Sequence, residues 1–280
     1  MTLRRVAVVA AVAVAVFVAV IAATFPTDTL LRALIARAIP SGSVVVAFTH
    51  AHLRPWGLRV DGVAVRAPDG SLVADAEWLS ARPSLTGFLR DRTGRPWRLG
   101  AGTCGGRVDA IVDQDDGGST ASITWDELDL ARCPPVALLG QTVAGVIGGT
   151  AVVRGAGTAA EGRIGLRGGV WKEAGRFVPA LETLHADPAS VAWTLRGNHL
   201  ELSGIAVDGP DVKATGGGTV EVARAPRESR LALSLIVAPG PQAPPGFRDL
   251  LARLPATGDG DARRLEVGGT LGFPQLVRAP

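Results

Sequence analysis

Alternation of apolar and polar residues with a period of two runs through most of the chain after Ser43, and it restricts the possible folds most strongly. Successive side chains of a strand point to opposite faces of a sheet, so this pattern predicts half-buried strands. It is clear in "SVVVAFTHAHL", in "LRVDGVAVRAPDGSLVADAEWLSARPS" around an Asp69–Gly70 turn, and in "SVAWTLRGNHLELSGIAV" around Gly197–Asn198. It returns in "TVEVA", "SRLALSLIVA" and "RLEVGGTLGF". We predict a mainly β fold, a long, curved antiparallel meander.

The composition agrees with many short strands and turns. The 280 residues include 36 glycines and 19 prolines, and large core side chains are few, with 7 Phe, 6 Trp, 1 Met and no Tyr. We therefore expect a broad, thin core. A few short helices are expected to interrupt the meander, at "PPVALLGQ", "EAGRFVPALETLH" and "PGFRDLLARL".

The clearest alternation also predicts which side chains form the apolar face of the sheet. These are Val191, Trp193, Leu195, Leu231, Leu233, Leu235 and Val237. Such a face can close over its own core, or it can remain a groove that accepts acyl chains. The alternation is the same in both cases, and a sheet of this size favours the filled core.

The N-terminal segment predicts a membrane anchor. Residues 6–25, from Val6 through Phe17 to Phe25, are apolar except for Thr24 and are long enough to cross a bilayer as a helix. A cleaved signal peptide is the alternative, but the run is long for one and ends without a small-residue cleavage pattern. Arg4 and Arg5 favour a cytoplasmic N-terminus.

This anchor sets the expected organisation of the chain. Residues 1–5 form a cytoplasmic tail, 6–25 a transmembrane helix, 26–40 a short amphipathic helix ending at Pro40, and 41–280 a β-rich domain outside the cytoplasm. The short helix is expected to cap the end of the sheet, or to lie on the lipid.

Two cysteines, Cys104 and Cys133, lie at the outer ends of a predicted hairpin with a turn at "QDDGGS". Antiparallel pairing brings those ends together, so a disulfide is favoured in an oxidising compartment. Two buried free thiols are the alternative.

No pattern indicates catalysis, a cofactor or a metal. Gly100, Gly102 and Gly105 match G-x-G-x-x-G, but a strand-like segment follows where a dinucleotide fold needs a helix. The acidic turn Asp113, Asp115 and Asp116 lacks the other ligands of a calcium loop, and His50 and His52, which share a strand face, lack a third ligand nearby. A net charge of +3 without a basic patch argues against nucleic acid. We expect a non-enzymatic protein.

Three parts of the chain resemble the type II secretion system protein N family. They are the anchor with Phe25–Pro26, the stretch "PWGLRVDGV" at 55–63, and Gly269–Leu271 with Pro274 after it. The resemblance implies a single-pass protein of the bacterial inner membrane with a periplasmic domain, an accessory structural part of the machine that exports folded proteins. Its partners would be other secretion components, with lipid around the anchor. The repeated strands also look like a short AsmA-like protein, which implies the alternative of a module that binds lipid in a β groove or transfers it between the two membranes.

Overall fold

The computed structural model describes residues 44–54, 56–84, 96–115, 118–138, 142–155, 158–176, 182–223, 225–254 and 261–277. The predicted anchor, with Val6, Phe17 and Phe25, and the predicted helix at 26–40 lie outside these ranges. Within them, no helix combines the length and the hydropathy needed to cross a membrane.

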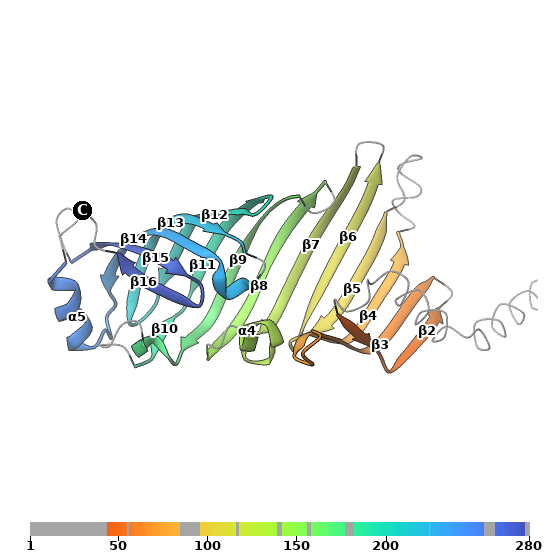
Figure 1. Cartoon of the computed structure of the whole chain (residues 1–280), viewed down its shortest axis with the longest axis horizontal. Coiled ribbons are helices and arrows are strands. Elements are labelled where there is room, and N and C mark those ends of the chain that lie inside the picture. The colour runs from red at the N-terminus through yellow and green to blue at the C-terminus, as the bar shows by residue number, and fades with distance from the viewer. Residues whose placement is uncertain are drawn as a thin grey trace, which may run out of the picture.

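The described residues form one 16-stranded antiparallel sheet, which confirms the predicted mainly β fold (Figure 1). The strands are β1 Val45–Ala47, β2 His50–Arg54, β3 Gly57–Arg66, β4 Leu72–Pro83, β5 Trp97–Thr103, β6 Gly106–Asp115, β7 Gly118–Asp129, β8 Val143–Arg154, β9 Ala159–Trp171, β10 Leu184–Ala186, β11 Ala189–Arg196, β12 His199–Asp208, β13 Val212–Glu221, β14 Arg230–Pro239, β15 Arg263–Thr270 and β16 Phe273–Val277. Almost every strand pairs with its neighbours in sequence, so the sheet is an up-and-down meander.

Two of the meander's strands are interrupted. β1 and β2 pair with opposite ends of β3 in one register, and β10 and β11 pair with successive parts of β9. The first break faces Gly62, which has a φ of +63°, and a side chain there would collide with Thr49. The single strand expected over "SVVVAFTHAHL" is therefore divided in two.

Two of the three expected helices are present. α4 Pro134–Leu138 follows β7, and α5 Pro245–Ala252 begins after Pro244 with proline in its first turn, where a missing N–H is harmless. The third prediction, over "EAGRFVPALETLH", is wrong at its end, because Leu184 and His185 belong to β10. The His185 backbone N–H donates to the Asp211 carboxylate at 2.8 Å, and β10 pairs with β9, so tertiary contacts override the helical pattern.

The described residues also form three single-turn 3₁₀ helices, η1 Leu130–Arg132, η2 Ala174–Arg176 and η3 Pro226–Glu228. η1 leads from β7 into Cys133, which forms a disulfide with Cys104 in the β5–β6 turn, as predicted. The two Cα atoms are 4.9 Å apart. The bond joins the residue before α4 to the turn of the β5–β6 hairpin.

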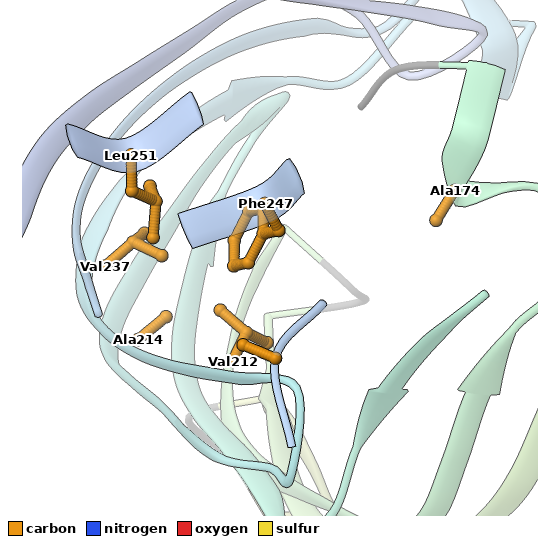
Figure 2. Packing of buried hydrophobic residues seen from close by; sticks show 7 residues of the cluster. Ala174, Val212, Ala214, Val237, Phe247 and Leu251 are labelled. Carbon is orange, nitrogen blue, oxygen red and sulfur yellow. The ribbon is translucent and has the colours of Figure 1, made fainter. Parts of the chain in front are cut away.

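Among the described residues, the two clusters of buried apolar side chains lie near the ends of the sheet. One consists of Phe48, Ala51, Val60 and Val63. The other lies beneath α5, where Phe247 and Leu251 pack on β13 and β14 (Figure 2). Between them, over the described parts of β5 to β12, the buried apolar residues are alanines, Ala151 and Ala160.

Glycines in the middle of the sheet make room for large side chains of adjacent strands. A Cβ at Gly162 in β9 would collide with the Thr150 carbonyl oxygen of β8 and lie 2.8 Å from the indole of Trp193 in β11. A Cβ at Gly165, in the same strand, would meet nothing closer than 3.9 Å.

These two glycines form a matched test of packing. We expect Gly162→Ala to lower the free energy of unfolding by about 1–3 kcal/mol, because the methyl group would collide with the Thr150 carbonyl oxygen and with the indole, so both must shift. Gly165→Ala should leave it unchanged or raise it by up to about 1 kcal/mol, since the unfolded chain loses entropy. Urea unfolding followed by circular dichroism measures both, and equal effects would contradict the packing argument.

Candidate functional site

One row of residues crosses the sheet from β2 to β16 without a polar side chain. Each member is the register partner of the next: Leu53, Leu58, Ala81, Leu99, Ala110, Ile123, Ala151, Gly162, Trp193, Leu202, Gly218, Leu233, Val267 and Leu276. We call it the apolar row. Strands lie about 4.8 Å apart, so the row extends for roughly 60 Å along the sheet.

A second row on the same face repeats this character over β3 to β11. It consists of Val60, Leu79, Ala101, Val108, Trp125, Gly149, Ile164 and Val191. The row between the two points to the opposite face and is mostly polar: Arg59, Ser80, Gly100, Asp109, Thr124, Thr150, Arg163, Ala192 and Ser203. The sheet therefore separates an apolar face from a polar one across most of its width.

The apolar face is hollowed over β3 to β7. A depression of about 420 Å³ is lined by Leu58, Val60, Leu79, Ser80, Ala81, Leu99, Gly100, Ala101, Val108, Ala110 and Ile123. Leu79 and Leu99 remain 37% and 40% exposed, so their side chains are available to a ligand. We call this depression the hollow.

Two tryptophans lie against glycines on this face beyond the hollow. Trp125 would come within 2.8 Å of a Cβ at Gly149, and Trp193 stands in the same relation to Gly162. The glycines let each indole rest on the backbone of the adjacent strand, so large aromatic surfaces stay low on the face. The Trp193 indole N–H is buried and has no hydrogen-bond partner among the described residues.

The predicted apolar-face residues occupy the other half of the same face. Val191, Trp193 and Leu195 belong to β11, and Leu231, Leu233, Leu235 and Val237 belong to β14. The register connects Leu195 through Leu200 and Val220 to Leu231. A second depression, of about 320 Å³, lies beside Leu231 and Leu233.

α5 closes this face at its C-terminal end. Figure 2 shows Phe247 and Leu251 directed toward Val237, Ala214 and Val212. Among the described residues, the sheet therefore has a filled core beneath α5 and a face over β3 to β7 whose hollow no other element covers.

The opposite face carries paired charges. Arg107 and Asp109 lie side by side on β6 at 2.6 Å, and the hydrogen bond and charge of Asp109 raise the pKa of the Arg107 guanidinium above its ordinary value. Arg59 and Asp61 form a similar pair at 2.8 Å on β3. These pairs balance their own charges and hold no reactive group.

The described residues of the glycine, histidine and aspartate motifs lie in strands and turns of the sheet. Gly100 and Gly102 lie in β5 and Gly105 in the β5–β6 turn, and β6 follows them, as the rejection of a dinucleotide site requires. His50 and His52 lie on β2 with ring centroids 6.1 Å apart, and His52 is 3.6 Å from Asp61. No group of three metal-ligating side chains occurs among the described residues. Asp113 and Asp115 end β6, and Asp116 lies outside the described ranges.

The sequence analysis did not identify the hollow. Its lining alternates, but alanine and glycine supply many of its positions, and these give a weak apolar signal. The hollow could have been predicted from small apolar residues in β4 and β5 that alternate with leucines along the same strands.

Comparisons with protein-family models, with curated proteins and with solved structures find no match for this chain.

Proposed function

We propose that this protein binds lipid acyl chains along the apolar row, as a lipid-binding or lipid-transfer module of the bacterial cell envelope. The supporting observation is the apolar row itself, one nonpolar position on each strand from β2 to β16 except β10, with the hollow beside it. In this proposal the segment at 6–25 anchors the chain in the inner membrane and the sheet lies in the periplasm.

The proposal follows from what an exposed apolar face requires. Large contiguous apolar patches are uncommon on the surface of monomeric soluble proteins, and they mark binding sites for apolar partners. An acyl chain fits such a face because it needs no hydrogen bonds. Burial of ten of its methylene groups would contribute about 8 kcal/mol before the costs of association.

A structural role in type II secretion is the second candidate, and it rests on the resemblance together with one observation. Phe273 and Leu276 of the edge strand β16 are 76% and 50% exposed, which suits contact with a protein partner. The edges themselves favour strand addition less. β16 is short and contains Pro274, and the opposite edge is broken between β1 and β2.

A matched pair of variants tests the acyl-chain proposal. Leu99 and Ile111 are 40% and 41% exposed on adjacent strands, and their side chains point to opposite faces. Cells expressing the full chain are fed a fatty acid with a photoreactive group in its tail, illuminated, and the labelled peptides are identified. We expect Leu99→Glu to reduce labelling of peptides that line the hollow at least about tenfold, because a carboxylate under an acyl chain would be desolvated without a partner.

Ile111→Glu should retain this labelling, since it adds the same charge to the polar face. Labelling of the 6–25 segment provides the internal reference for exposure to the probe. Equal labelling of both faces in the unmodified chain, or no loss in Leu99→Glu, would overturn the proposal.

The same variants separate the two candidate functions in the native bacterium. Under the lipid proposal, Leu99→Glu makes the outer membrane permeable to a bulky antibiotic while type II substrates are still released. Loss of secretion with an intact barrier would instead support the secretion role.

A further inference from the structure

Three arginines form a line at one end of the first strands. Arg54 of β2 is the register partner of Gly57 in β3. Gly57 lies beside Arg82 of β4, since a Cβ at Gly57 would be 2.9 Å from the Cβ of Arg82. Arg82 in turn is the register partner of Arg98 in β5. All three side chains are exposed. Arg82 and Arg98 are directly opposite each other, and like charges in that position repel.

Three carboxylates lie near this line on the same face of the sheet. Asp113 is two positions from Ile111, the register partner of Arg98, and forms no ion pair among the described residues. The other two pair with other arginines. Asp61 accepts from Arg59, and Asp109 accepts from Arg107. Within the described part of the chain, Arg54, Arg82 and Arg98 form no ion pair. Three arginines beside one unpaired carboxylate leave the line with a net positive charge among the described residues.

Two exposed tryptophans lie at the same end of the strands. Trp56, in the turn between β2 and β3, is 69% exposed, and Trp97, at the start of β5 opposite Pro83, is 47% exposed. We call Arg54, Trp56, Arg82, Trp97 and Arg98 together the rim.

The rim borders the hollow. The next level of the sheet inward from the arginines contains Leu53, Leu58, Ala81 and Leu99, and the last three line the hollow. Trp97 and Leu99 alternate on one strand, so they point to the same face. Arg54, Arg82 and Arg98 alternate with these residues along their strands, so the arginines point to the opposite, polar face, and Trp97 is the rim residue on the face of the hollow.

We infer that the rim docks on the surface of an anionic phospholipid bilayer. Tryptophan favours the bilayer interface, where its ring lies among the headgroups, and arginine pairs with lipid phosphates. Each basic side chain close to an anionic membrane strengthens binding about fivefold. The inference adds a membrane contact to the proposed function, and it depends on that function only for the route by which lipid reaches the hollow.

The test uses the full chain reconstituted into vesicles that contain lipid brominated on its acyl chains, which quenches nearby tryptophan. The quenching of the rim tryptophans is the loss of tryptophan fluorescence in the unmodified chain minus the loss in W56F/W97F. One set of vesicles is phosphatidylcholine, and in the other a third of the lipid is phosphatidylglycerol. We expect rim quenching in the anionic vesicles, at least about fivefold less of it in the neutral ones, and its loss at high salt.

R54Q/R82Q/R98Q should lose this quenching in anionic vesicles. R196Q/R227Q/R230Q removes three exposed arginines of β11, η3 and β14, with the same change in net charge, and should retain this quenching. Equal quenching in both kinds of vesicle, or no quenching of the rim tryptophans, would overturn the inference, and the latter would point to a protein partner.

The outcome is separable from that of the proposed function. Rim quenching without acyl-chain labelling of the hollow would refute the lipid-binding proposal alone. Labelling of the hollow without quenching that depends on phosphatidylglycerol would refute the rim inference alone.

Discussion

Replacing Phe247 with alanine is expected to lower the free energy of unfolding by about 3–5 kcal/mol. The ring is 4% exposed and packs with Val212, Ala214 and Val237 beneath α5. No other large cluster of buried side chains supports this end of the sheet among the described residues. The loss therefore combines a removed transfer free energy with a cavity that a short helix cannot close.

Phe273→Ala is the control, because that ring is 76% exposed and should contribute within about 0.5 kcal/mol. Urea unfolding gives the stability of both variants, and hydrogen exchange locates the change. We expect the amides of α5 and β14 to exchange faster in Phe247→Ala, since contacts in a meander are made mainly with sequence neighbours. Equal stabilities of the two variants would show that α5 does not hold the end of the sheet.

Removing the disulfide with C104S/C133S is expected to cost about 3–4 kcal/mol. The bond joins residues 29 positions apart and encloses the whole β6–β7 hairpin, so it restricts the unfolded chain considerably. Cys104 has a φ of +53° in the tight β5–β6 turn, and serine there bears the same backbone penalty, so the comparison isolates the cross-link.

The measurement compares urea midpoints of the unmodified chain and the variant, with and without a reductant. The reduced unmodified chain should match the variant, and the variant should not respond to the reductant. A variant as stable as the oxidised chain would show that the hairpin is held by strand pairing alone.

Much of the meander could be predicted because its signals are local. Glycine at Gly70 and Gly197, both with positive φ, marks turns between alternating segments, and the β3–β4 and β11–β12 hairpins form there. The cysteines could be paired because a hairpin brings its own ends together. In each case the decisive partners are close in sequence.

The breaks within strands and the helix that is not formed at Leu184 and His185 could not be predicted in this way. The division of β1 from β2 depends on a glycine in the facing strand, and β10 depends on Asp211 and β9. These partners are distant in sequence, and a single segment carries no record of them.

By itself the sequence determined that an apolar face exists, since alternation assigns every second side chain to it. Only the tertiary structure decided how that face is aligned and covered. Register between many strands joins single residues such as Leu58, Leu99 and Ile123 into one apolar row and sets Arg82 beside Arg98. α5 covers β13 and β14 but leaves β3 to β7 open, because one helix of eight residues can bury only the strands that it reaches.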